Sequence, residues 1–342
     1  MVVPDSLDGA PNPNGDGLLS REAGPNVVAL GGGHGLSATL RALRHITSQI
    51  TAVVTVADDG GSSGRIREET AVLPPGDLRM AIVSLCNTPE KELAWPALMQ
   101  LRLQTNGPLN NHALGNLLIV GLWQIFDDPV VGLDWLGHLL GSQGRVLPMS
   151  SVPLRIDATV QEGEGTRQIS GQTTVATAGP HLLDLSVTPG NAPVPPQTLE
   201  AVGGADWVIL GPGSWFTSVI PHLLVEDLRR ALIMTPAHRA LILNLIPQSG
   251  ETDHMSSADL VRKIHQVAPD LKIDVVIADP TTVEDVDDLM EASTLLGARV
   301  LLRQVRSGEN GAIHDPLRLA SALRDAFDGF LGEVGMSEPW LD

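Results

Sequence analysis

The stretch that decides the fold is NVVALGGGHGLSATLRALRHI, residues 26–46, followed shortly by ITAVVTV, residues 50–56. An apolar run of strand length leads into a glycine-rich turn, and leucines then recur at helical spacing at Leu36, Leu40 and Leu43. The second apolar run is again of strand length. Strand, turn, helix and strand in this order form a βαβ unit, which predicts a parallel sheet with a right-handed crossover.

The alternation of strands and helices continues through most of the chain. Strands are expected near 207–210, 240–245, 273–277 and 298–303, and helices near 78–86, between 95 and 139, and near 222–234, 258–267, 283–296 and 316–331. Between 145 and 188, short alternating runs separated by glycine are typical of antiparallel strands. We therefore predict a single Rossmann-like three-layer α/β/α sandwich over 26–342 with a mostly parallel sheet, an inserted antiparallel β region at about 145–190, and a disordered tail at 1–25.

The composition is that of a globular protein with an acidic surface. The 342 residues are 43% hydrophobic and carry a formal net charge of −18. Such a surface argues against binding nucleic-acid polymers or anionic membranes, which rely on basic patches. Cys86 is the one cysteine, so no disulfide can form within the chain, and no apolar run reaches the length of a membrane span. The first residues lack the basic segment and apolar core of a signal peptide, so we expect a cytoplasmic protein without membrane insertion.

The loop after the second strand, ADDGGSSGR at 57–65, carries more polar groups than a turn requires. In open parallel sheets the carboxyl ends of the strands form the ligand-binding edge, so this position favours a functional role. Asp58 stands where a ribose-binding acid would stand, or Asp58 and Asp59 together could hold a metal ion such as Mg²⁺. Ser62, Ser63 and the backbone N–H groups could form an anion nest that Arg65 closes. The alternative is a flexible surface hairpin.

Two glycine-rich turns follow predicted strands and could bring backbone N–H groups close to a phosphate. The candidate ligand-binding residues are, in GGGHGLS, Gly31, Gly32, Gly33, His34, Gly35 and Ser37 and, in GPGSWFTS, Gly211, Gly213, Ser214, Thr217 and Ser218. The first turn matches the dinucleotide fingerprint G-x-G-x-x-G at two glycines but has Leu36 at the third. Each turn could be a plain strand-to-helix connection, although two of them in one sheet favour a binding cleft.

Three further polar stretches are candidates for the walls of that cleft. They contribute Gly76, Asp77 and Arg79 from PPGDLR, Asn111, His112 and Asn116 from NNHALGN, and Asn244 from the end of a strand. Asp77 could simply be the N-cap of the next helix, and Asn111 could likewise be a cap. Arg79 lies in a first helical turn, where the dipole disfavours a cation, so contact with a ligand is an equally good explanation. His112 and Asn116 are four residues apart, which would place them on one helix face.

No convincing nucleophile or metal-hydrolase constellation is visible, and the catalytic residues, if there are any, are unknown. The sequence contains no P-loop G-x-x-x-x-G-K-[ST], no H-E-x-x-H and no C-x-x-C. The buried-helix position of Cys86 favours a core residue. The site predicted from the residues is therefore a cleft rich in N–H groups rather than a catalytic centre.

Taken together, the motifs resemble the YvcK family of gluconeogenesis factors, within the CofD-like superfamily that includes 2-phospho-L-lactate transferase. The match is carried by GGGHGLS, TVADDGGSSGRIRE, LPPGDLRMAIVSL, NHALGN, GPGSWFTS and the N-x-x-P-Q-x-G-E-T stretch from Asn244, and it spans most of the chain after residue 26. Three positions depart from the usual pattern. His34 stands where the family usually has Thr, Met80 where Asn is usual, and Phe216 where Tyr is common.

The resemblance implies a Rossmann-like fold and a cytoplasmic protein that binds a UDP-sugar such as UDP-N-acetylglucosamine, or another nucleotide. It also implies a link to cell shape and envelope growth on gluconeogenic carbon sources. The CofD branch instead transfers 2-phospho-lactate to a deazaflavin with Mg²⁺. We therefore expect a non-catalytic nucleotide-sugar-binding protein, with a Mg²⁺-dependent transferase and a dinucleotide-dependent oxidoreductase as alternatives. The oligomeric state stays open, a homo-oligomer included.

Overall fold

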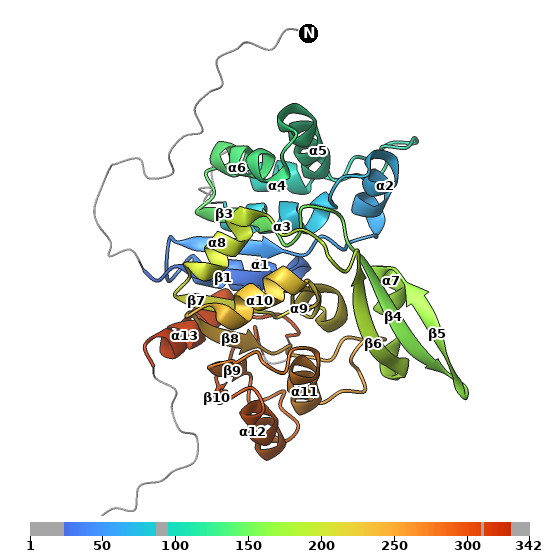
Figure 1. Cartoon of the computed structure of the whole chain (residues 1–342). Coiled ribbons are helices and arrows are strands. Elements are labelled where there is room, and N and C mark those ends of the chain that lie inside the picture. Colours follow the sequence, from blue (N-terminus) through green and yellow to red (C-terminus); the bar gives the residue numbers. More distant parts are fainter. Residues whose placement is uncertain (1–23, 87–94, 309–310, 330–342) are drawn as a thin grey trace, which may run out of the picture.

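The computed structural model describes residues 24–86, 95–308 and 311–329. Its centre is a seven-stranded sheet in the order β10-β9-β8-β7-β1-β2-β3, in which all neighbouring strands are parallel (Figure 1). The strands are β1 (Val27–Gly31), β2 (Ile50–Val54), β3 (Gly144–Pro148), β7 (Trp207–Leu210), β8 (His238–Ile242), β9 (Val275–Ala278) and β10 (Arg299–Leu302). The predicted α/β sandwich with a mostly parallel sheet is confirmed.

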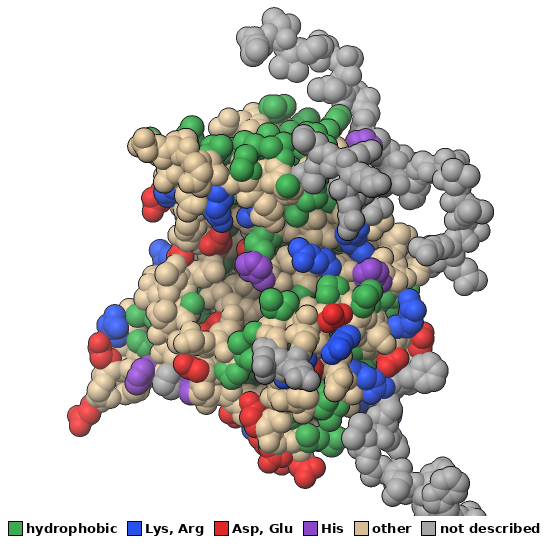
Figure 2. All heavy atoms as spheres, turned by 180° about the vertical axis from the view of Figure 1, so that it is seen from behind, with side chains coloured by type: hydrophobic (Ala, Val, Ile, Leu, Met, Phe, Trp, Pro, Cys, Tyr) green, Lys and Arg blue, Asp and Glu red, His purple; other side chains and the backbone are tan. Residues whose placement is uncertain are grey.

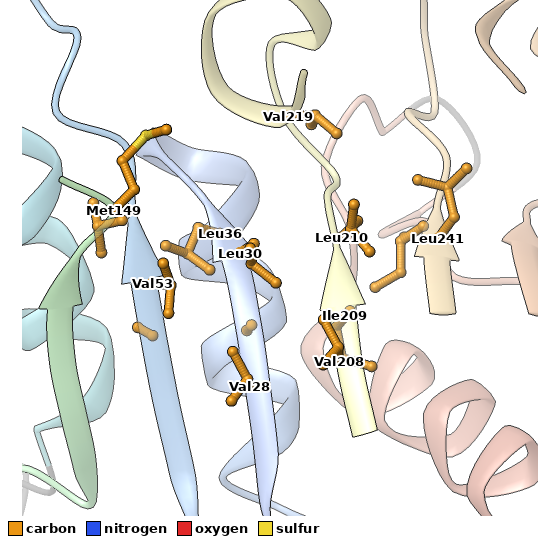
Figure 3. Close-up of a cluster of buried hydrophobic side chains, with 14 of the residues drawn as sticks. Val28, Leu30, Leu36, Val53, Met149, Val208, Ile209, Leu210, Val219 and Leu241 are labelled. Atoms are coloured by element: carbon orange, nitrogen blue, oxygen red, sulfur yellow. The ribbon is translucent and has the colours of Figure 1, made fainter. Parts of the chain in front are cut away.

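Helices cover both faces of the sheet, which explains why its strands are apolar throughout. On one face α1 (Gly33–Leu43) packs against α3 (Pro75–Leu85) and α13 (Pro316–Phe327). On the other face α8 (Pro196–Gly203) packs against α10 (Glu226–Met234). Figure 3 shows Leu36 of α1 among the side chains of β1 and β2 in the resulting core.

The sheet has a topological switch point between β1 and β7. From β1 the chain crosses through α1 to β2, whereas from β7 it crosses through α10 to β8, in the opposite direction along the sheet. Right-handed crossovers then place α1 and α10 on opposite faces. The crossovers that leave β1 and β7 run in opposite directions from this point, and open α/β sheets bind their ligands in the crevice at such a point.

The other elements lie mainly in two excursions from the sheet. The first, between β2 and β3, contains α2 (Gly61–Thr70), α4 (Trp95–Gln100), α5 (Leu114–Phe126) and α6 (Pro129–Leu139), besides α3. The second is an antiparallel sheet of β4 (Arg155–Glu162), β5 (Gly165–Ser170) and β6 (Leu182–Thr188) with the short α7 (Gln172–Val175). In Figure 1 this sheet projects from the edge where the main strands end. α11 (Ser257–Val267) and α12 (Val286–Thr294) pack together beyond β8.

Several predicted boundaries differ from the structure. The inserted sheet runs from residue 155 to 188, because the segment 144–148 pairs in parallel with β2 as the edge strand β3. The helix expected near 222–234 is two helices, α9 (Pro221–Leu224) and α10, with extended backbone at Val225 between them, and a π-helical turn at Trp215–Val219 precedes them. The tail predicted at 1–25 lies outside the described residues except for its last two. No helix in the described part of the chain is both long and apolar enough to cross a bilayer.

The polar loop at 57–65 is shorter than predicted. A helix, α2, begins at Gly61, so its serines and Arg65 are helical rather than part of a hairpin. The glycines and serines of this segment have low intrinsic helix propensity, and contacts with α3 and α5 override it. This change has consequences for the site, because a helix directs successive side chains to different faces.

Candidate functional site

The turns after β1 and β7 lie directly against each other at the switch point. A Cβ atom at Gly35 would lie 2.1 Å from the carbonyl oxygen of Pro212 and 2.6 Å from Cα of Gly213, so the two backbones meet without room for a side chain. Seen from behind, the molecule has a hollow between the part that carries α2 and the inserted sheet, with side chains of both charges around it (Figure 2). The glycine turns therefore converge on one edge of the sheet.

The N-terminus of α1 lies at the same place, and the N–H of its first residue, Gly33, donates to the carboxyl group of Asp77. Its N-cap, Gly32, has no side chain to bond the N–H groups of the first turn. Those groups have no partners within the helix and carry partial positive charge, which attracts anions. A Cβ atom at Gly32 would lie 2.4 Å from Oδ2 of Asp77 and 2.6 Å from Cγ2 of Thr55, so both side chains approach the bare backbone. His34, in the same turn, is exposed.

Two carboxyl groups with raised pKa values stand beside this helix end. The pKa of Asp77 is raised to about 7, first by burial and then by the charge of Asp58, against a hydrogen bond from the Gly33 N–H. The pKa of Asp58 is also raised, mainly by burial, although the Gly60 N–H donates to it at 2.9 Å. Asp77 is not an N-cap, because α3 begins after Pro74 and Asp77 lies within its first turn. Asp77 can thus hold a proton near neutral pH.

Asp59 points away from Asp58, toward the inserted sheet. Its carboxylate accepts hydrogen bonds from the backbone N–H groups of Gln172 (2.8 Å) and Thr173 (3.3 Å), at the start of α7. This arrangement does not match the predicted Mg²⁺ site, in which Asp58 and Asp59 would face one ion. Within residues 24–86, 95–308 and 311–329, no three acidic, histidine or cysteine side chains are grouped to hold a metal ion.

The turn after β7 is filled by groups of the protein itself. Oε1 of Glu251 accepts hydrogen bonds from the Phe216 N–H (2.6 Å) and the Ser214 hydroxyl (2.8 Å). Asn244 accepts from the Gly213 N–H and donates to the Gly213 carbonyl, both at 2.9 Å. We expected these N–H groups to contact a phosphate, and the structure instead places a carboxylate of the same chain there. Ser214 and Asn244 are therefore supports of the turn, and Thr217, whose N–H donates to Ser214 at 3.2 Å, belongs with them.

Replacing Glu251 with alanine should lower the free energy of unfolding by about 3 kcal/mol, because the buried donors of Phe216 and Ser214 lose a charged acceptor. Equilibrium unfolding in urea measures this change. Glu164→Ala, in an exposed turn of the inserted sheet, is the control and should stay within about 0.5 kcal/mol of the wild type. An E251A protein as stable as that control would show that the carboxylate does not hold the turn.

Four of the predicted residues form a separate polar network between α2, α3 and α5. The Ser62 hydroxyl lies 3.0 Å from Nδ1 of His112 and accepts a hydrogen bond from Asn116, also at 3.0 Å. Asn116 accepts in turn from Nε of Arg79 at 2.8 Å. All four side chains are at most 5% exposed, so Arg79 faces the interior rather than a ligand. The predicted shared helix face of His112 and Asn116 is wrong, because α5 begins at Leu114 and Ser62 connects the two side chains instead.

Ser62 also resembles a nucleophile on a sharp turn. We expected no G-x-S-x-G elbow from the sequence, but residues 60–64, GGSSG, fit that pattern, and His112 lies where a base would. The hydroxyl is 5% exposed, however, and is already engaged by His112 and Asn116. Its position is that of a buried bridge between helices rather than of a group that attacks a substrate.

Two predicted residues lie outside the cleft. Arg65 donates hydrogen bonds to the carbonyl groups of Pro108 (3.1 Å) and Asn110 (2.8 Å), in the loop before α5. It therefore does not close the predicted anion nest. Asn111 is exposed, has a φ of +62°, and bonds through its backbone: its N–H donates to the Leu103 carbonyl (2.8 Å) and its carbonyl accepts from Arg102 (3.0 Å).

The remaining predicted residues support the backbone. Ser63 accepts a hydrogen bond from the Gly76 N–H (3.0 Å) and so joins α2 to α3. Ser37 donates to the Gly33 carbonyl within α1 (2.9 Å). Gly211, with a φ of +71°, turns the chain sharply after β7 in a conformation that favours glycine.

Thr55 and Ser218 complete the polar surroundings of the α1 N-terminus. Thr55, which we did not predict, follows β2; its hydroxyl is buried and has no hydrogen-bond partner within the described residues. Ser218, which we did predict, faces the same place, since its hydroxyl would lie 3.2 Å from a Cβ atom at Gly32. A single threonine at the end of an apolar strand carries no signal in the sequence.

Two cavities, of about 450 and 430 Å³, border the inserted sheet. The larger is lined by Phe216 from the turn after β7, by Leu182 of the insert, and by Lys263 of α11, among others. Its volume lies in the range of small-molecule sites. Within the described residues, neither lining includes the turn after β1.

Comparison with known proteins places the chain in a family. Residues 27–295 match the family described as 2-phospho-L-lactate transferase CofD. A Mycobacterium tuberculosis protein named "Putative gluconeogenesis factor" is 45% identical over 322 residues, 92% of each chain. A Bacillus subtilis protein named "Gluconeogenesis factor" is 34% identical over 88% of this chain and 98% of its own. A crystal structure of a UPF0052 family member from Bacillus halodurans, 31% identical, superposes with a TM-score of 0.79 over 88% of this chain and 99% of that one. The chain therefore belongs to the CofD family and, within it, to the gluconeogenesis factors of the YvcK group.

Proposed function

We propose that the protein is a non-catalytic gluconeogenesis factor that binds a sugar nucleotide, such as UDP-N-acetylglucosamine, at the switch point. The observation that supports this best is the N-terminus of α1, which has no side-chain cap from Gly32 and meets bare glycine backbone at the carboxyl edge of the sheet. Backbone N–H groups and a helix dipole attract a diphosphate locally even in a chain of net charge −18. In the cell such a protein would act in the cytoplasm and support cell shape and envelope growth on gluconeogenic carbon sources.

The alternative is a Mg²⁺-dependent transfer reaction of the kind that the family description names. That chemistry requires carboxylates that face one ion together with a phosphate. Asp59 is engaged by α7, and the carboxyl group that shares the surroundings of Asp58 is Asp77. The predicted pair of metal ligands therefore lends this reaction no support, and binding remains the better proposal.

UDP-N-acetylglucosamine should raise the melting temperature of the protein, because a ligand that binds only the folded state stabilises it by mass action. At a ligand concentration of a hundred times Kd, the free energy of unfolding should increase by about 2.7 kcal/mol. Differential scanning calorimetry with UDP-N-acetylglucosamine, uridine and N-acetylglucosamine measures the shift for each. No shift at millimolar sugar nucleotide would refute the proposal.

His34→Glu provides a sharper version of this test. A glutamate in the first turn of α1 should keep the helix as stable or make it slightly more stable, by up to about 1 kcal/mol, yet repel the diphosphate. The melting temperature of the variant without ligand should therefore equal that of the wild type, and UDP-N-acetylglucosamine should no longer raise it. His45→Glu, an exposed change of the same charge just beyond the other end of α1, should leave the ligand shift unchanged.

A further inference from the structure

Arg67 carries a half-buried guanidinium on α2. Among the residues that the structure describes, this side chain makes no hydrogen bond and no ion pair within 4 Å, although the carboxyl groups of Asp59 and Asp58 lie near enough to act on its charge. Burial lowers the pKa of its guanidinium, while the charges of Asp59 and Asp58 act in the opposite direction. A guanidinium stays charged at physiological pH, so its partial desolvation is unfavourable unless an anion compensates it.

The helical phase of α2 directs Arg67 toward the site and Arg65 away from it. Two successive steps in an α-helix turn by about 200°, so these side chains leave opposite faces. Arg67 follows Ser63 by one turn and shares its face. A Cβ atom at Gly76 would lie 2.4 Å from the Ser63 hydroxyl and 3.2 Å from Oδ2 of Asp58, which shows that this face looks toward the paired carboxyl groups.

A second arginine reaches the same place from the inserted sheet. Arg155 begins β4 directly after Leu154, whose N–H donates to the Val56 carbonyl (3.0 Å) just past the end of β2. Its guanidinium is paired with Asp157 at 2.9 Å and is more than half exposed. The positive charge of Arg155 acts on Arg67. Like charges held near each other repel, and an anion between them would relieve that repulsion.

We infer that Arg67, with Arg155 beside it, binds a phosphate group of the ligand and forms an anion subsite between α2 and the inserted sheet. The identity of the ligand as a sugar nucleotide rests on the proposed function, whereas the chemistry of the subsite requires only a phosphate or diphosphate. Arginine suits this role because its planar fork can donate two N–H groups to two phosphate oxygens. Asp58 and Asp59 oppose an anion, but Asp59 already accepts hydrogen bonds from α7.

The test compares Arg67→Ala with Arg65→Ala, the same change on the same helix but on the opposite face. Isothermal titration measures the affinity of wild type and both variants for two probes, inorganic pyrophosphate and UDP-N-acetylglucosamine. Arg67→Ala should weaken both by roughly 10- to 100-fold, the loss of one charge-assisted pair, with its melting temperature without ligand unchanged. The affinity of Arg65→Ala for each probe should stay within about twofold of the wild-type affinity. Arg67→Lys should bind both probes more tightly than Arg67→Ala, because lysine keeps the positive charge.

The outcomes separate this inference from the proposed function. If Arg67→Ala binds both probes as tightly as the wild type, or if Arg65→Ala weakens them equally, the subsite is refuted while binding of the sugar nucleotide stands. If pyrophosphate binds through Arg67 and UDP-N-acetylglucosamine does not bind, the subsite stands and the proposed function fails. If the wild type binds neither probe, both are overturned.

Discussion

A Gly35→Ala protein is expected to lose about 3 kcal/mol or more of its free energy of unfolding, and its binding site with it. The added Cβ atom would lie 2.1 Å from the carbonyl oxygen and 2.5 Å from the carbonyl carbon of Pro212. Both are backbone atoms, so α1 and the turn after β7 would have to separate. Alanine in place of glycine normally gains up to about 1 kcal/mol in a helix, and overpacking typically costs 1–3 kcal/mol or more, roughly in proportion to the overlap. With overlap this deep, the clash outweighs the gain.

Urea unfolding of Gly35→Ala beside Gly121→Ala checks this expectation. Gly121 is also helical, in α5, but a Cβ atom there would meet nothing within 4 Å. Gly121→Ala should therefore be neutral or slightly stabilising. If both variants were equally stable, the close contact between the two glycine turns at the switch point would be disproved.

Asp77→Asn is expected to stabilise the protein at pH 8.5 and to remove a dependence of stability on pH. Because the pKa of Asp77 is raised from 3.8 to about 7, the folded state holds a proton that the unfolded state releases. Asp77 alone should therefore contribute more stability as the pH falls through 7, by about 0.8 kcal/mol between pH 8.5 and 6.5, and Asp77→Asn should lack this contribution. Above pH 7 the ionised carboxylate destabilises the fold by an amount that approaches roughly 4 kcal/mol as an upper figure.

Comparison of the wild type with Asp77→Asn separates this effect from that of the buried histidines. The pKa values of His222 and His314 are lowered to about 4 by burial, so each removes stability as the pH falls through 6.5, about 0.4 kcal/mol already at pH 6.5, in the opposite direction. The wild type and Asp77→Asn share both histidines, so the difference between their free energies of unfolding in urea at pH 6.5, 7.5 and 8.5 reports Asp77 alone. For Asp270→Asn, an exposed control, the difference from the wild type should not change with pH. A difference between the wild type and Asp77→Asn that stays constant across this window would contradict a raised pKa at Asp77.

Most of the fold could be predicted because its signals are local. The apolar runs of β1, β2, β7, β8, β9 and β10 all appear as strand-length segments, and the leucines of α1 repeat with helical period. The edge strand β3 was the exception. Its five residues resemble the short runs of the antiparallel insert that follows, and only its parallel pairing with β2 distinguishes them.

The candidate site was predictable in position but not in detail. Glycine turns after two strands indicated the edge of the sheet, and the structure brings both turns into contact. The choice of Arg65 failed because ADDGGSSGR reads as a loop, in which the side chain could fold back on the anion nest. Once α2 begins at Gly61, Arg65 turns toward the loop before α5 and Arg67 takes the inward face.

The order of strands and helices, the glycine turns at the strand ends and the family follow from the amino-acid sequence, because periodicity, turn chemistry and motifs are properties of neighbouring residues. Which polar groups remain free for a ligand depends on how distant segments pack in the folded chain. Asp59 accepts a hydrogen bond from the Gln172 N–H, 113 residues away in the sequence. In the turn after β7, the Phe216 N–H donates to Glu251, 35 residues further along the chain. Such partners are chosen by the packing of distant elements, since a buried donor must find an acceptor wherever the fold supplies one.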